Sequence, residues 1–71
     1  MVTSILGTRI RQRRREVGMT QVHLAAKVDI SASYLNLIEW NKRPIAGSLL
    51  RKVADALDIS LAELDNATEH H

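Results

Sequence analysis

A chain of 71 residues has room for a single small domain, and its lack of cysteine excludes disulfides, thiolate metal sites and cysteine nucleophiles. The net charge is +2, but residues 1–43 carry eight Lys/Arg and three Asp/Glu, whereas residues 44–71 carry two and five. The basic half favours a polyanionic partner, and a solvated helix surface with chance asymmetry explains it equally well.

The apolar pattern predicts an all-α bundle of five short helices, because apolar residues recur at the helical spacing and alternate almost nowhere. In chain order, we expect helices at about residues 4–17, 20–28, 32–40, 47–57 and 60–66. One domain then spans residues 1–66. The tail at residues 67–71 ends in His70 and His71, which look like the remnant of a purification tag.

Sequence signals mark where several of these helices begin and where the first one ends. Gly18 suits the left-handed residue that ends the first helix. At three helix starts, an apolar residue stands before a Ser or Thr whose side chain can cap free backbone amides. These pairs are Met19–Thr20, Ile30–Ser31 and Ile59–Ser60. Local signals and apolar period therefore agree on where the helices begin.

The link between the second and third helices is unusually short, since only residues 29–31 separate them. So tight a link forces a steep crossing, which needs a small residue at the contact, and Ala25 supplies it. Asp29 tolerates the positive φ that the turn requires, and Ile30 can plug the turn into the core. Together these features predict a helix-turn-helix, whose second helix commonly enters the DNA major groove.

A resemblance to the XRE family, the lambda-repressor and Cro-like regulators, is carried by TQVHLAAKVDISASYLNLIEWNKRP and extends through LLRKVADALDISLAEL. It implies a five-helix lambda-repressor-like fold and sequence-specific binding of double-stranded DNA by a bacterial or phage transcriptional regulator. It also implies a homodimer on a near-palindromic operator. The chain departs from the family in having Asp29 where Gly is usual. A further similarity, in SASYLNLIE and RPIAGSLL, is to regulators of short-chain acyl metabolism and implies a C-terminal sensor domain in a longer parent protein.

The expected third helix has two unlike faces at 100° per residue. One face carries Tyr34, Leu35 and Ile38. The opposite face lacks the Lys and Glu that solvate an ordinary exposed helix, and it carries Ser33, Asn36, Leu37 and Trp40. A face that lies against base edges must be free of long charged side chains, so this pattern is typical of a recognition helix.

Four residues of this helix are therefore candidates for base contacts. Ala32 and Ser33 allow close approach at the helix N-terminus, Asn36 can hydrogen-bond a base or phosphate, and Leu37 can sit on a thymine methyl. The alternative is that Leu37 and Trp40 bury against another part of the chain or a second subunit.

Phosphate contacts are expected on both sides of the recognition helix. The family resemblance implies that Gln21, at the start of the second helix, holds a DNA phosphate. Three residues that follow the recognition helix would grip the backbone without reading sequence, namely Asn41, Lys42 and Arg43. Trp40 either packs against sugar-phosphate or braces the loop.

The arginine run of the first helix is expected to be only partly available to DNA. Arg14 lies four residues after Ile10 and points toward the core, where it needs a partner. Glu39, at the edge of the buried face of the third helix, is the best candidate, and the family resemblance supports this structural pair. The remaining arginines are expected to face solvent, namely Arg9, Arg11, Arg13 and Arg15.

No pattern for catalysis, metal binding or a cofactor is present in the sequence, so we expect no enzyme activity. No apolar run is long enough to span a membrane and no signal peptide is evident, which favours the cytoplasm. The alternative function is a protein-interaction module such as an antitoxin-like XRE domain, with Leu37 and Trp40 as an apolar docking patch.

Overall fold

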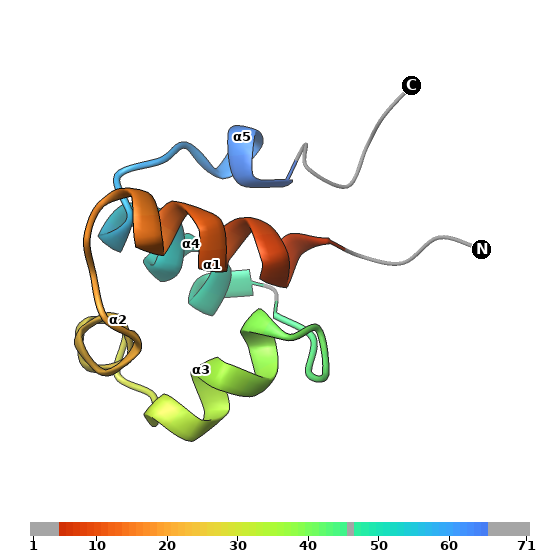
Figure 1. Cartoon of the computed structure of the whole chain (residues 1–71). Helices are drawn as coiled ribbons and strands as arrows, with labels where there is room; N and C mark the ends of the chain where they lie inside the picture. The colour runs from red at the N-terminus through yellow and green to blue at the C-terminus, as the bar shows by residue number, and fades with distance from the viewer. Residues whose placement is uncertain (1–4, 46, 66–71) are drawn as a thin grey trace.

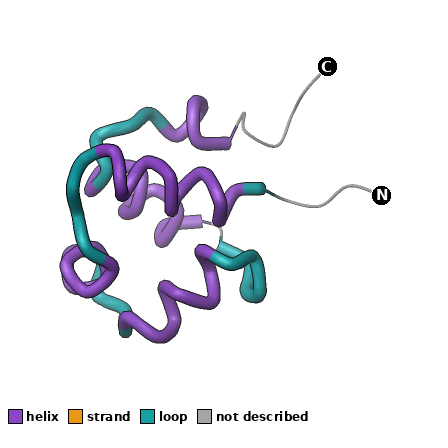
Figure 2. Tube along the Cα trace, viewed as in Figure 1, coloured by secondary structure: helices purple, strands orange, loops and turns teal. Residues whose placement is uncertain are grey.

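The computed structural model describes residues 5–45 and 47–65, apart from the Asp65 side chain. Five helices follow one another, and the described residues contain no strand (Figures 1 and 2). They are α1 (Leu6–Glu16), α2 (Gln21–Lys27), α3 (Ala32–Glu39), α4 (Gly47–Ala56) and α5 (Leu61–Asp65). The predicted all-α five-helix class is confirmed. The expected helix limits at residues 4 and 66 and the tail at 67–71 lie outside the described residues.

Helix α1 is the centre of the arrangement (Figure 1). It packs against α3 on one side and α5 on the other, while α2 contacts α3 and α4, and α4 contacts α5. The core between them consists of aliphatic side chains, with Ile10, Leu24, Leu35, Val53 and Leu57 all fully buried. Burial of this apolar surface is the main source of stability for so small a domain.

Three of the links between helices share one backbone design. The second residue after each helix has positive φ, and the residue that follows it donates its N–H to a carbonyl five residues back. The residues at positive φ are Gly18 at 71°, Asp29 at 63° and Asp58 at 56°. The bonds are Met19 N to Arg14 O at 3.0 Å, Ile30 N to Ala25 O at 3.0 Å and Ile59 N to Ala54 O at 3.1 Å. The positive φ expected of Asp29 is thus confirmed.

The next residue in each link starts the following helix. Each of the three hydroxyls accepts a backbone N–H three residues on, at 3.0 Å, as an N-cap does. The pairs are Thr20 with His23, Ser31 with Tyr34 and Ser60 with Glu63. Each of these four-residue links therefore ends with a left-handed residue, an apolar residue and an N-cap, and this order of residues turns the chain within a short connection.

Tyr34 departs from the burial expected for the inner face of α3. Leu35 and Ile38 are buried as expected, but Tyr34 is 38% exposed. Tyr34 lies at one edge of the apolar stripe and Glu39 lies at the other. The core covers the Glu39 edge, with Glu39 at 0% exposed, and leaves the Tyr34 edge open.

Helices α1 and α3 come close together at Gly7, a residue that the sequence patterns did not single out. A Cβ on Gly7 would overlap the carbonyl oxygen of Ile38 and lie 2.7 Å from Asn41 Oδ1. Asn41 itself has φ 59°, and its Oδ1 accepts the Gly7 backbone N–H at 3.0 Å. The N-cap residue of α1, Ile5, makes no side-chain cap bond, so Asn41 supplies a cap from a distant part of the chain.

We predict that Gly7→Ala destabilises the domain by about 1–3 kcal/mol, because the added methyl overlaps backbone that cannot move aside. An unobstructed Gly→Ala change inside a helix would instead stabilise it by about 1 kcal/mol, so the sign of the effect is decisive. The measurement is the free energy of unfolding in urea.

Gly18→Asn is the matched control. Nothing lies within 4 Å of a Cβ at Gly18, and asparagine tolerates its positive φ, so little change is expected. A Gly7→Ala variant as stable as the original protein would show that the α1–α3 approach is not tight.

Candidate nucleic-acid interface

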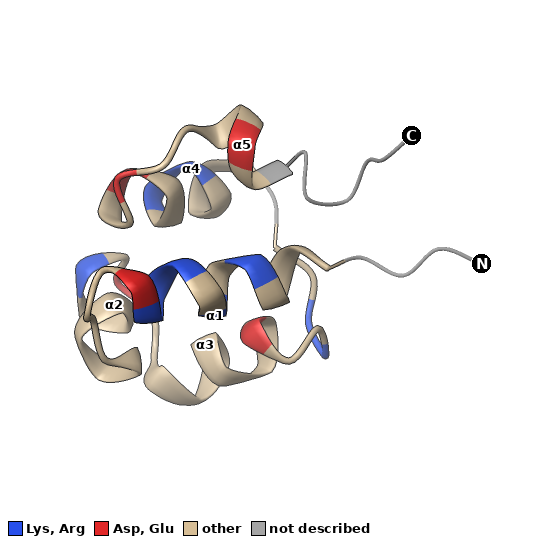
Figure 3. Cartoon of the chain, turned by 45° about the horizontal axis from the view of Figure 1, so that its top comes forward, with Lys and Arg blue, Asp and Glu red and all other residues tan. Residues whose placement is uncertain are grey.

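The outward face of α3 is uncharged, as the sequence predicts, and it is partly exposed. Ser33 and Asn36 are exposed and Leu37 is half-buried. Ala32 is also half-buried and packs against the core, so only part of its side chain is available at the surface. Figure 3 shows that α3 carries no Lys or Arg along its length, while basic residues lie on α1 and in the loop after α3. This face can therefore approach another surface closely.

Trp40, at the end of α3, is held by Arg11 from α1. Trp40 is 54% exposed, and the Arg11 guanidinium carbon lies 4.0 Å from the centroid of its ring, in cation–π geometry. Arg11 Nη1 also donates to the Glu39 carbonyl at 2.9 Å. This geometry favours the brace interpretation of Trp40 over contact with sugar-phosphate.

The expectation that Arg11 and Arg13 face solvent is wrong. Arg13 donates from Nε to the Leu57 carbonyl and from Nη2 to the Asp58 carbonyl, each at 3.0 Å. The last carbonyls of a helix lack intrahelical partners and carry partial negative charge, so they attract guanidinium groups. Arg11 satisfies this need at the end of α3, and Arg13 does so just beyond α4.

The other two arginines of the run differ from each other. Arg15 is exposed, in line with the expectation. Arg9 is only half-buried, but its Nε is enclosed and has no hydrogen-bond partner among the described residues. Arg9 therefore does not face solvent fully, although the sequence led us to expect that it would.

A hydrogen-bonded chain begins at the ion pair expected between Arg14 and Glu39, which is present. Arg14 Nε donates to Glu39 Oε2 at 2.7 Å, and Arg14 Nη2 donates to Glu39 Oε1 at 3.0 Å. Arg14 Nη1 donates to the Met19 carbonyl at 2.9 Å. Glu39 is fully buried, and the Arg14 side chain is 11% exposed, so solvent screens this pair little.

The chain continues from Glu39 to the recognition face through Gln21. Gln21 Nε2 donates to Glu39 Oε1 at 3.1 Å and to Asn36 Oδ1 at 3.3 Å. Both hydrogens of this amide are therefore engaged inside the protein. The Gln21 backbone N–H lies in the first turn of α2, where helix amides lack an intrahelical acceptor, and it remains the group suited to a phosphate.

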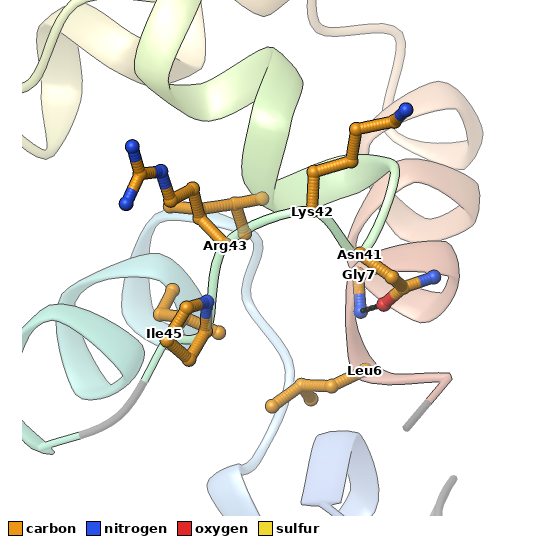
Figure 4. Close-up of a pocket in the computed structure, with 8 residues that line it drawn as sticks. Leu6, Gly7, Asn41, Lys42, Arg43 and Ile45 are labelled. Carbon is orange, nitrogen blue, oxygen red and sulfur yellow. Dashed lines mark hydrogen bonds between the residues drawn. The ribbon is translucent and has the colours of Figure 1, made fainter. Parts of the chain in front are cut away.

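The loop after α3 contains one residue whose side chain binds α1 and two residues whose side chains extend into solvent. Besides accepting from Gly7, Asn41 donates from Nδ2 to Thr8 Oγ1 at 3.2 Å, so its side chain is engaged in holding α1. Asn41 is nevertheless exposed, so the phosphate contact expected of it stays a prediction. Lys42 and Arg43 are exposed, and Figure 4 shows both side chains extending away from Leu6.

A groove of about 320 Å³ lies beside this loop, between the start of α1 and the end of α3. Apolar residues line most of it, including Leu6, Ile38, Pro44 and Ile45. Within the residues that the structure describes, no group of three or more His, Cys, Asp or Glu is arranged to hold a metal ion. Across the same part of the chain, every helix is too short or too polar to span a membrane.

Comparison with known proteins identifies the family. A helix-turn-helix family model matches residues 10–64. This chain belongs to the XRE-type helix-turn-helix family. Members of this family are DNA-binding transcription regulators, and the predicted recognition helix is α3 of this helix-turn-helix domain.

Individual proteins of the XRE type agree with this assignment. The regulator PrpR of Mycobacterium tuberculosis is 43% identical over 54 residues, which are 76% of this chain and 11% of PrpR. The P22 c2 repressor in complex with a synthetic operator gives a TM-score of 0.79 at 29% identity, covering 87% of this chain and 94% of the repressor. The biofilm regulator SinR in complex with DNA gives 0.75 at 38% identity, covering 83% and 95%. The chain thus spans about a tenth of the length of PrpR.

We predict that Arg14→Met costs about 3 kcal/mol of stability, because it leaves the buried Glu39 carboxylate without its cation. The double variant Arg14→Met, Glu39→Leu should recover most of that loss, since apolar residues can replace a buried ion pair. Urea unfolding measures both.

Arg15→Met serves as the control on the same helix, and its exposed side chain predicts a change within about 0.5 kcal/mol. Equal effects of Arg14→Met and Arg15→Met would show that the pair does not stabilise the fold.

Proposed function

We propose that this domain binds double-stranded DNA sequence-specifically, with α3 in the major groove, as the DNA-binding part of a transcriptional regulator. The observation that carries the proposal is the uncharged, partly exposed face of α3 next to two exposed cations, Lys42 and Arg43. Ala32, Ser33, Asn36 and Leu37 then face the base edges.

The phosphate contacts in this proposal differ from those expected from the sequence alone. Lys42 and Arg43 remain side-chain contacts, since both are exposed. Gln21 contributes its backbone N–H, because its side-chain amide is engaged by Glu39 and Asn36. Asn41 also acts indirectly, since its side chain fixes the start of the loop that carries the two cations.

The assembly that fits this role is a homodimer on a near-palindromic operator in the cytoplasm. One copy offers a small recognition face, and a two-fold dimer doubles the number of base pairs that are read. The chain matches about a tenth of PrpR, which fits a longer parent protein. The C-terminal sensor domain in this proposal comes from the sequence resemblance. No catalytic or cofactor role is part of the proposal.

The competing function is a protein-interaction module, for which the exposed part of Trp40 is the best argument. Arg11 stacks on this ring, which reduces the apolar surface left for a protein partner. Titration of a random duplex pool at several salt concentrations separates the two functions. DNA binding that weakens steeply with salt supports our proposal, whereas no binding even at low salt supports the interaction module.

Lys42→Ala should weaken binding to every sequence by a similar factor, because it removes one phosphate contact. The slope of the logarithm of the binding constant against the logarithm of the salt concentration should become about one unit less steep. Lys52→Ala, on α4, makes the same change in charge away from the recognition helix and should leave the slope unaltered. Titrations at four or more salt concentrations give the slopes. Equal slopes for both variants and the original protein would remove Lys42 from the interface.

Leu37→Ala should cost about 1–3 kcal/mol of binding to the preferred site, mostly at one base pair, and little on a scrambled site. The reason is that an apolar contact with a base edge is lost while the phosphate contacts remain. The matched control is Leu61→Ala on α5, which should change neither titration. A Leu37→Ala variant that loses stability or dimerisation but keeps its base preference would mean that Leu37 is a packing residue.

A further inference from the structure

The groove beside the loop after α3 has an apolar lining that the proposed DNA contacts leave unused. This lining comes from Leu6 of α1, Ile38 of α3, and Pro44 and Ile45 of the loop, around a volume of about 320 Å³. Figure 4 shows Leu6 and Ile45 on different sides of the groove. DNA phosphates are bound by cations and hydrogen-bond donors, so an apolar groove adds nothing to their binding. The groove is therefore suited to a different ligand.

Hydrogen bonds between the loop and α1 fix the walls of this groove. Asn41 Oδ1 accepts the Gly7 backbone N–H at 3.0 Å, and Asn41 Nδ2 donates to Thr8 Oγ1 at 3.2 Å. Gly7 and Asn41 both line the groove, so these bonds join its two sides. A ligand thus meets a preformed site and loses little free energy to ordering it.

The rim of the groove is positively charged. Lys42 and Arg43 belong to its lining and are exposed, and neither side chain forms an ion pair with the described residues. No Asp or Glu is present among the described residues that line the groove. An acidic ligand is therefore attracted to this rim, and a basic one is repelled.

The positions of the two cations favour a ligand with several acidic groups. Figure 4 shows the Lys42 and Arg43 side chains extending in different directions from the loop, so a single anionic head group pairs with only one of them. A polypeptide segment can place an aliphatic side chain in the groove and acidic side chains before and after it, and so pair with both. The groove lies at the lower end of the range of roughly 300–1,000 Å³ for ligand pockets, which suits one anchor residue.

We propose that this groove binds an acidic segment of a partner protein. One aliphatic residue of the segment is anchored among Leu6, Ile38 and Ile45, and flanking Asp or Glu residues pair with Lys42 and Arg43. The same two cations are phosphate contacts in the proposed DNA binding, so the segment and DNA exclude each other and the partner releases the domain from its operator. Only this exclusion rests on the proposed function.

Selection from a random peptide library displayed on phage, with the whole chain immobilised, tests the groove. The selected peptides should share a Leu, Ile or Met flanked by Asp or Glu. Replacing one acidic residue of a selected peptide by its amide should weaken binding by about threefold. A library that yields no binding peptide, or only peptides without acidic residues, would overturn the proposal.

Ile45→Gln removes apolar surface from the groove without changing the charge, and it should weaken peptide binding by about tenfold. Its affinity for random duplex DNA should stay within about twofold, because Lys42 and Arg43 remain. Val17→Gln is the matched control, since Val17 is 40% exposed at the opposite end of α1 from Leu6, and it should change neither affinity. Equal peptide affinities for Ile45→Gln and the original protein would show that the peptide binds elsewhere.

A measurement on the original protein keeps the test decisive if Ile45→Gln fails to fold. In an NMR titration with a selected peptide, the backbone amide signals of Leu6, Gly7 and Ile45 should shift, and that of Val17 should stay. Shifts confined to other parts of the chain would refute the site. Shifts of the groove signals on raising the protein concentration, without peptide, would show that a second copy of this chain fills the groove instead.

Competition separates this proposal from the proposed function. A selected peptide should displace random duplex DNA, and its apparent affinity should fall as DNA is added. A peptide that binds while the DNA stays bound would overturn the exclusion. A protein that binds the peptide in the groove but binds no DNA, even at low salt, would refute the proposed function and support the groove as a binding site.

Discussion

A buried carboxylate holds the recognition helix in place. Glu39 ends α3 with no exposed surface, and an ionised group is stable there only if donors surround it. The donors come from two other helices, Arg14 of α1 and Gln21 of α2. Three helices that are individually too short to be stable are thus joined by hydrogen bonds to one buried carboxylate. Any shift of α3 against α1 or α2 would break these bonds where water cannot replace them.

The arginines of α1 show why charge along a sequence is a poor guide to a DNA surface. Arg11 and Arg13 bind carbonyls at the ends of other helices, and Arg14 neutralises Glu39. These three cations are used within the fold. Much of the positive charge in the first half of the chain is therefore used to stabilise the fold and is not available to a polyanion. Few exposed cations lie beside α3.

Most of the fold could be predicted from local signals, because helix caps and left-handed residues act within a few positions. Asp29 at positive φ and the burial of Arg14 both follow from spacing. The Arg13 bonds to the end of α4 and the Asn41 bond to Gly7 could not be predicted, because these partners are distant backbone groups, which have no signature in the sequence. The burial expected for Tyr34 was wrong. Helical phase predicts which residues form the apolar face of α3, but it does not predict which edge of that face the neighbouring helices cover. At the candidate site, phase predicted the exposed face of α3, but the engaged amide of Gln21 depends on three-dimensional contacts alone.

The first half of the loop after α3 is held by hydrogen bonds to α1 and α3, whereas the second half can change in length. Asn41 sits at φ 59° with its amide bound to α1, and the Lys42 N–H closes the end of α3 on the Leu37 carbonyl at 2.8 Å. A residue inserted before Lys42 would break both attachments and uncap α1. A residue inserted after Arg43 would leave them intact and lengthen only the approach to α4. Variation in loop length among relatives of this domain should therefore accumulate on the α4 side, where side chains can be added without moving α3.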